Sequence, residues 1–283
     1  MRPDHPMFFV RPGAPDVTPA NTLTGPSSAR IHNYLLGGRD HHSGDRDVAH
    51  QAADKLPFLE SAVRHERIYV LLMVQAMAIA GIRQLVDFGC GMPYSLNPVD
   101  VITRVHPKAR AVCIDHDAAV HAHTSALLKV GAPATVAHLR ADIGEPESVL
   151  ASREIMETIN WREPVILLFG SVLHHIGDTP ARPLSVLVDQ YKKVAASGSA
   201  LVITHSTADF AGQPARKVAK AVTAAGCPVY LRTKEQIAPL FDDWHLVHPG
   251  LVKPQAMALE YPVHQQAASY AGMARKEVAH GSV

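Results

Sequence analysis

The feature that most constrains this chain is an apolar segment that ends in two glycines, residues 85–91 (LVDFGCG). Residues Gln84 to Phe88 form a short apolar run, which predicts a buried strand. Glycine has no Cβ, so the backbone can turn sharply at Gly89 and Gly91 and a ligand can approach it closely. A helix is predicted at about Pro98 to Val105. A strand, a Gly-x-Gly turn and a helix predict a nucleotide-binding turn at the carboxyl edge of a parallel sheet.

Asp87, just before the two glycines, helps to choose between two nucleotide cofactors. A carboxylate there can bind the ammonium group of S-adenosylmethionine (SAM), whereas it would repel the pyrophosphate of a dinucleotide. The third glycine of the dinucleotide motif is also missing, because Tyr94 stands in its place. The alternative is an ordinary strand followed by a glycine turn without a ligand.

The rest of the chain alternates between apolar runs and helical patterns. Further strands are expected at 109–115, 135–139, 164–169, 199–205, 245–251 and 269–276, and helices between them at 118–131, 145–158, 181–195, 213–226 and 234–241. This order predicts a doubly wound, mostly parallel, seven-stranded α/β sheet with an antiparallel pair at its edge. We expect a flexible N-terminal arm (1–28), a helical N-terminal lid (29–82) and a Rossmann-like cofactor-binding domain (83–278).

Composition excludes several classes of function. The 283 residues carry 27 basic and 26 acidic side chains, and this balance gives no reason to expect a nucleic-acid partner. Three cysteines do not suggest a disulfide framework, so a cytoplasmic location is expected. The first residues lack the apolar core of a signal peptide, and no apolar run is long enough to span a membrane. The 18 histidines show no spacing typical of metal ligands, so no metal site is expected.

Three acids follow or end three successive predicted strands: Asp87, Asp115 and Asp142. The carboxyl ends of neighbouring parallel strands meet at one crevice, so these side chains are expected to lie together. Asp115 lies at the spacing from Gly91 at which a carboxylate accepts ribose hydroxyls, and Asp142 is placed to accept the adenine amino group. Ile143 could pack on the purine ring. The alternative for each acid alone is a role in a turn or helix cap.

A second group follows the fourth predicted strand, where the reactive end of a cofactor should lie. Ser171 is expected at the cofactor, and His174 and His175 could take a proton from a nucleophile, because imidazole titrates near neutral pH. The alternative is that one histidine packs inward and the other makes a structural hydrogen bond.

Five segments, in order, resemble one known family: 30–40 (RIHNYLLGGRD), 87–93 (DFGCGMP), 113–117 (CIDHD), 172–175 (VLHH) and 270–276 (YAGMARK). The family is a group of actinobacterial SAM-dependent methyltransferases first catalogued as a domain of unknown function. The resemblance covers roughly residues 28–276. It implies a class I methyltransferase fold with SAM as cofactor and S-adenosylhomocysteine (SAH) as product.

The resemblance also suggests further cofactor contacts. Tyr34, Gly37 and Gly38 are expected to close over the cofactor, with Tyr34 facing it. Apart from the resemblance, Arg67, on the helix before the first strand, is a candidate for the methionine carboxylate. A helix stop followed by a surface loop is the alternative for the two glycines. His116, beside Asp115, stands where the family usually has asparagine, so the adenosine wall differs here.

The expected function is methyl transfer to an O, N or C nucleophile of a small molecule, in secondary metabolism. No nucleic-acid or membrane partner is expected, and a homodimer is possible. The alternative from another class is a SAM-binding protein that regulates without methyl transfer. An NAD-dependent oxidoreductase is disfavoured by the missing third glycine.

Overall fold

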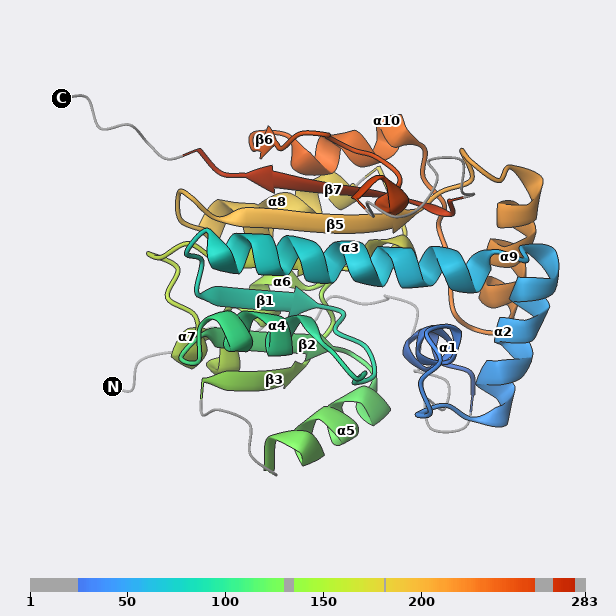
Figure 1. Ribbon diagram of the computed structural model, residues 1–283, viewed down its shortest axis with the longest axis horizontal. Helices are drawn as coiled ribbons and strands as arrows, with labels where there is room; N and C mark the ends of the chain where they lie inside the picture. Colours follow the sequence, from blue (N-terminus) through green and yellow to red (C-terminus); the bar gives the residue numbers. More distant parts are fainter. Residues whose placement is uncertain (1–24, 130–134, 181, 258–266, 278–283) are drawn as a thin grey trace, which may run out of the picture.

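The computed structural model describes residues 25–129, 135–180, 182–257 and 267–277, which form a central sheet flanked by helices (Figure 1). The strands are β1 (Gln84–Phe88), β2 (Arg110–Asp115), β3 (Val136–Arg140), β4 (Ile166–Phe169), β5 (Ala200–Ser206), β6 (His245–Leu246) and β7 (Ser269–Arg275). Their order in the sheet is β3-β2-β1-β4-β5-β7-β6. The first five are parallel, and β7 runs antiparallel to both β5 and β6. The predicted doubly wound, seven-stranded sheet is confirmed.

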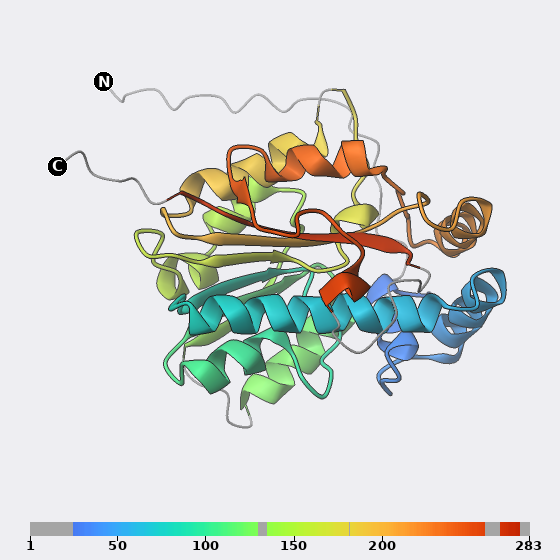
Figure 2. The same ribbon diagram turned by 45° about the horizontal axis from the view of Figure 1, so that its top comes forward.

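Of the described helices, three precede the first strand, and the others lie in the connections between strands. They are α1 (Ser28–Leu35), α2 (Ser43–Lys55), α3 (Leu59–Ile79), α4 (Pro98–Val105), α5 (Ala118–Lys129), α6 (Pro146–Leu150), α7 (Arg153–Thr158), α8 (Leu184–Val194), α9 (Gln213–Ala224) and α10 (Lys234–Ile237), with 3₁₀ turns η1 (Leu173–His175), η2 (Ala238–Phe241) and η3 (Pro254–Met257). Figure 2 shows the sheet between two helical layers, with α3 (cyan), α4 and α5 (green) on one face and α8 (yellow) and α10 (orange) on the other.

Both faces of the sheet are apolar, as expected for parallel strands covered on both sides. All five residues of β1 are buried. Val86 and Phe88 point to the layer that contains α8, where Phe88 stacks on Phe169 with ring centroids 4.3 Å apart. Leu85 points to the other layer and packs with Val74 of α3. The alternation along β1 therefore builds two cores from one short strand.

A third, smaller core lies beyond the carboxyl ends of the parallel strands, where α1, α2 and α9 gather (Figure 1). Ile31 and Leu35 of α1 pack there against Ala49 of α2 and Val222 of α9. We call α1, α2 and α9 the cap. The long helix α3 serves both regions, because Val63 near its start packs in the cap while its later turns pack on the sheet. The expected lid of residues 29–82 is thus joined to the sheet through α3.

Local differences from the predicted elements have visible causes. The helix expected at 145–158 is two helices, because Ser152 caps α7 by accepting a hydrogen bond from the Ile155 backbone N–H. Pro183 precedes α8, so this helix starts at Leu184, later than the predicted 181; residue 181 itself lies outside the described residues. The strand expected at 245–251 pairs over only two residues.

Residues 1–24 of the expected arm lie outside the described residues, whereas its last residues are docked. The backbone carbonyl of Gly25 accepts a hydrogen bond from Arg30, and that of Pro26 accepts one from Cys227. The Ser27 hydroxyl donates to Asp117, after β2. These three residues are therefore docked against the cap and the sheet, whereas the expectation of a flexible or loosely docked arm for the residues before them stays a prediction.

Candidate active site

A cavity of about 220 Å³ lies between the carboxyl ends of the parallel strands and the cap. Ten of the predicted site residues line it: Arg67, Asp87, Gly89, Gly91, Asp115, His116, Ile143, Ser171, His174 and His175. The crossing from β1 to β4 is where the strand order reverses, which is the usual place for a ligand in such a sheet. We distinguish a β1–β2 half (Asp87, Gly89, Gly91, Asp115, Ile143) from a β4–β5 half (His32, Glu66, Ser171, His174, His175).

The β1–β2 half is built mainly from backbone groups. The N–H groups of Gly89 and Cys90 both donate to the carbonyl of Ile114, at 2.8 and 3.0 Å. One carboxylate oxygen of Asp115 accepts from the Gly91 N–H at 2.9 Å, and the other accepts from the Asp117 N–H at 3.0 Å. The turn after β1 is therefore tied to the end of β2, and the Asp115 carboxylate is held at the cavity wall.

Gly89 has no substitute in this turn. Its φ of +73° lies in the left-handed region, and a Cβ there would come within 2.2 Å of a methyl carbon of Val172. The missing side chain thus lets the turn after β1 approach the turn after β4. This close approach joins the two halves of the cavity.

Asp87 is a buried acid whose pKa is raised. Burial raises its pKa to about 7, with a further increase from Asp115 and an opposing effect from Arg67. Burial also raises the pKa of Asp115. Two buried carboxyl groups with raised pKa values would be stabilised in the ionised form by a cationic ligand.

Arg67 lies at the cavity but is partly occupied. Its Nη2 donates to the carbonyl of Leu96 at 2.7 Å and to the Asn97 side-chain oxygen at 3.0 Å. Its Nε is buried without a partner among the described residues. Arg67 therefore keeps its Nε–H for a ligand, while the contacts of its Nη2 hold the loop before α4.

Tyr34 does not face the cavity, contrary to the expectation from the sequence. Its hydroxyl group lies 2.6 Å from His50 Nε2, and its ring meets the rings of His41 and His50 edge-on. The opposite face of α1 lines the cavity instead, through residues that include His32 and Leu36. The motif located the helix correctly, but it did not fix which face of the helix points inward.

Gly37 and Gly38 end α1 and do not belong to the described cavity wall. The Gly37 N–H donates to the Tyr34 carbonyl and the Gly38 N–H to the Asn33 carbonyl, each at 2.8 Å. A Cβ on Gly38 would lie 2.4 Å from the Asn33 side chain. Asn33 in turn accepts the Asp40 N–H at 3.0 Å. The glycine pair is explained by this helix stop, which was the alternative interpretation.

Asp142 is exposed and is absent from the described cavity wall, while its neighbour Ile143 is buried in it. An oxygen of Asp142 accepts the Gly144 N–H at 2.7 Å, which is an ordinary turn contact. The proposed contact of Asp142 with adenine is therefore not supported by its position.

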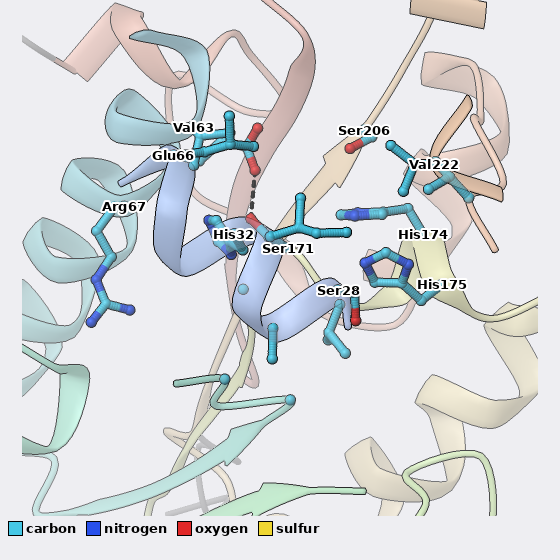
Figure 3. A pocket seen from close by; sticks show the side chains of 18 of the residues that line it. Ser28, His32, Val63, Glu66, Arg67, Ser171, His174, His175, Ser206 and Val222 are labelled. Atoms are coloured by element: carbon cyan, nitrogen blue, oxygen red, sulfur yellow. Dashed lines mark hydrogen bonds between the residues drawn. The ribbon is translucent and has the colours of Figure 1, made fainter. Parts of the chain in front are cut away.

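Glu66 in the β4–β5 half was not predicted. It is only 5% exposed, and it accepts a hydrogen bond of 2.5 Å from the Ser171 hydroxyl (Figure 3). The Ser171 backbone N–H donates to the Thr204 hydroxyl at 2.8 Å. Burial raises the pKa of Glu66, against hydrogen bonds that lower it. A sequence signal existed, because Glu66 falls between Val63 and Val70 at the spacing of the buried face of α3.

The turn that carries His174 and His175 is held by Arg232, which is 5% exposed. Arg232 donates to the carbonyls of Leu173 at 3.2 Å and Ile176 at 2.7 Å, one on each side of the two histidines. Its Nε also donates to Asp178 at 2.9 Å. No motif pointed to Arg232, because it lies more than fifty residues after the turn.

His175 has a defined tautomer. Its Nδ1 lies 2.7 Å from the Pro228 carbonyl, which can only accept, so Nδ1 carries the proton and Nε2 keeps its lone pair. Burial lowers the pKa of His175, although this hydrogen bond raises it. His174 is more deeply buried, its pKa is lowered further, and its Nδ1 has no described partner. Both rings are neutral at pH 7.

His32 of α1 also lines the cavity, although the sequence did not predict it as a site residue. Burial lowers its pKa to about 4, with smaller effects from Arg67 and His175. All three imidazoles of the β4–β5 half are therefore uncharged near neutral pH.

A buried ion cluster fixes α1 over the cavity. Arg30, 2% exposed, donates from Nε to Asp45 at 2.8 Å, and its Nη1 lies 3.9 Å from Asp117. Asp45 also accepts the backbone N–H groups of Ser27 and His42. Asp45 thus occupies the N3 position of a capping box at the start of α2, with His42 as the N-cap residue. The cluster joins both helices to the segment after β2.

Residues 19–277 match the model of a protein family described as S-adenosyl methyltransferase. The chain belongs to this family. The methyltransferase is also similar to two solved structures: a DUF574 family protein from Streptomyces avermitilis (30% identity, TM-score 0.83, covering 89% of this chain and 98% of that one) and a proposed methyltransferase from Thermobifida fusca (29% identity, TM-score 0.83, covering 93% and 100%).

More distant structures share the fold only. An O-methyltransferase family protein from Burkholderia thailandensis is 12% identical, with a TM-score of 0.50, over 87% of the methyltransferase and 64% of its own length. Among curated proteins, none matches the chain. The resemblance seen in the sequence is confirmed, and the enzyme uses SAM.

The β1–β2 half of the methyltransferase fits this cofactor. Asp87 offers a buried carboxyl group to an ammonium, and Asp115 keeps free acceptor capacity toward the cavity for hydroxyl groups, since each oxygen accepts only one described hydrogen bond. Gly91 leaves open space above the turn, since no atom lies within 4 Å of where its Cβ would be, and Ile143 offers an apolar surface. No group of three or more described His, Cys, Asp or Glu residues is placed to hold a metal ion. Among the described helices, none has the length and hydropathy of a membrane span.

Proposed function

We propose that this enzyme transfers the methyl group of SAM to an O, N or C nucleophile of a small molecule, as part of cytoplasmic secondary metabolism. The observation that supports the proposal is the continuity of the cavity, which places the β4–β5 half directly beside the half that fits the cofactor. Bound SAM would supply an electrophilic methyl group on a sulfonium. The three described cysteines are free, which agrees with a reducing compartment.

The residues of the chain then align the reactants and exclude water. Asp87 and Asp115 hold the cofactor from the side of β1 and β2, and α1 covers the cavity as a lid, with His32 and Leu36 in the wall. His175 Nε2 accepts a hydrogen bond or a proton from the nucleophile, because its other nitrogen is committed to Pro228. Enclosure of the reactants by the cap strengthens each of these polar contacts.

The proposal is tested in two steps. Titration calorimetry should show binding of SAM and SAH but not of NAD, and a ligand at about a hundred times its dissociation constant should stabilise the fold by roughly 2.7 kcal/mol. Incubation with SAM and a panel of small phenols, amines and carbon acids should then release SAH. Binding of SAM without SAH release from any acceptor would favour the alternative, a SAM-binding regulator.

A further inference from the structure

The β4–β5 half contains a buried acid that has no cationic partner. No ion pair of the described residues includes Glu66. Its hydrogen-bonding neighbours are neutral: the Ser171 hydroxyl donates to it, and the hydroxyl of Thr204, behind the cavity wall, lies 3.1 Å from that of Ser171. His32 and His174, from α1 and the turn after β4, are uncharged because burial lowers their pKa values.

Arg67 is next to Glu66 in sequence but does not neutralise it. Successive residues of a helix point about 100° apart, and Figure 3 shows the two side chains directed to different sides of α3. The Arg67 guanidinium donates to Leu96 and Asn97, at the loop before α4. Its charge acts on Asp87 in the β1–β2 half. The carboxyl group of Glu66 therefore faces the cavity without a counter-ion.

The surroundings of Glu66 are apolar on the side of the cap. Leu35 of α1, Leu56 at the end of α2, Val63 of α3, and Val218 and Val222 of α9 line this part of the cavity, which we call the apolar chamber. A buried carboxylate in such surroundings is costly unless a cation pairs with it. The chamber itself suits a hydrocarbon or aromatic group.

We propose that the methyl acceptor is an amine on an apolar or aromatic body, with its ammonium group on Glu66 and its body in the apolar chamber. This inference rests on the proposed methyl transfer to a small molecule and narrows the acceptor to one chemical class. Charge-assisted hydrogen bonds between an ammonium and a carboxylate are among the strongest available to a ligand. The ammonium of SAM would pair with a different acid, Asp87, in the β1–β2 half of the cavity.

The carboxylate can also prepare the amine. Burial raises the pKa of Glu66 and disfavours the ammonium form of a buried amine, so one proton can pass from nitrogen to carboxylate. The products of this transfer are a neutral acid and a neutral amine, whose nitrogen lone pair is then free to act as a nucleophile. No other group gains or loses charge in this step, and His175 Nε2 can accept the second proton, which the nitrogen releases after it has been methylated.

The test uses two compounds of matched size, phenethylamine and 2-phenylethanol, titrated by calorimetry into the full chain saturated with SAH. Phenethylamine should bind, and Glu66→Gln should weaken it at least about tenfold, because the substitution removes the charge but keeps the shape. Binding of 2-phenylethanol should be weaker and should not change. Glu60→Gln is the matched control: it removes the same charge from an exposed site on α3.

Each other result would overturn the inference. Equal effects of Glu66→Gln on both compounds, no effect on either, or no binding of phenethylamine to the SAH complex would each exclude Glu66 as an amine site. If Glu66→Gln also weakened the binding of SAH by at least about tenfold, Glu66 would be assigned to the ammonium of the cofactor instead. Thermal melting of each variant shows that the fold is intact. Failure of the wild-type chain to bind SAH would be a different result, because it would contradict the proposed function itself.

Discussion

The two halves of the cavity are made from different parts of the chain. The β1–β2 half consists of turns that follow directly on strands, with backbone N–H groups and two acids within thirty residues of each other. The β4–β5 half consists of side chains from α1, α3 and the turn after β4, held by Arg232 from far along the chain. The difference suggests that the first half is fixed by local geometry and the second by packing of the cap. Substitutions in each half should therefore have different effects.

The largest loss of folding stability should come from substituting Arg30, which links the cap to the segment after β2. Arg30→Met leaves Asp45 and Asp117 buried without their cation, and breaking a buried ion pair from one side costs about 3–5 kcal/mol. Urea unfolding measures this loss. Arg39→Met, at an exposed position just after α1, is the control and should change little. A loss below about 1 kcal/mol for Arg30→Met would contradict the role of the cluster.

The same cluster predicts a dependence on pH. Burial alone would raise the pKa of Asp45, but the hydrogen bonds from Arg30, His42 and Ser27 outweigh it, so the pKa lies below the ordinary value of 3.8. Asp45 therefore stabilises the fold at neutral pH, and this contribution is lost as the pH falls below 3.8 through the lowered pKa. Asp45→Asn should remove that part of the acid dependence in unfolding measurements, whereas Asp54→Asn, at an exposed site on α2, should not.

The next effect concerns the chemistry of the β4–β5 half. His175→Gln should slow SAH release about a hundredfold, as expected for loss of a proton acceptor, with SAH affinity unchanged. In the wild type, the rate should fall only below pH 6.5, since burial lowers the pKa of this ring and the neutral form is the active one. A pH–rate profile checks both points. An unchanged profile in the variant would show that His175 takes no part.

Binding in the β1–β2 half should respond to Asp115. Asp115→Ala removes acceptors for ligand hydroxyls and the anchor of the Gly91 N–H, and hydrogen bonds to a charged group contribute about 1.5–3 kcal/mol. SAH affinity should fall at least about tenfold by calorimetry. Asp142→Ala is the matched control, because this exposed acid stands outside the cavity wall. If the two variants bind SAH equally, the assignment of Asp115 fails.

The smallest effect should come from Tyr34. Tyr34→Phe removes one hydrogen bond to His50 on the outer side of α1, so stability should fall by no more than about 1 kcal/mol. SAH affinity should stay the same. A loss of affinity would restore the sequence-based expectation that Tyr34 faces the cofactor.

The sequence predicted the β1–β2 half well because its parts are local. A strand, two glycines and an acid at the end of the next strand are enough to place Asp87, Gly89 and Asp115 at one edge. The sequence could not place Glu66 or His32, since their roles depend on how α3 and α1 rotate against the sheet and the cap. The same cause explains the wrong orientation of Tyr34, which is only two residues from His32. Helix rotation is a property of packing, which a short motif does not encode.

Helix α3 has one more consequence. Glu66 and Arg67 are consecutive residues of a 21-residue helix whose later turns are packed on the sheet. Glu66 belongs to the β4–β5 half, whereas the charge of Arg67 lowers the pKa of Asp87 in the β1–β2 half. The positions of these two side chains are therefore linked through one rigid helix and do not depend on the closure of a loop. If SAM lies near Arg67 and an amine at Glu66, then relatives that vary α1, α2 and α9 would admit acceptors of other shapes and still keep the same spacing between methyl donor and methyl acceptor.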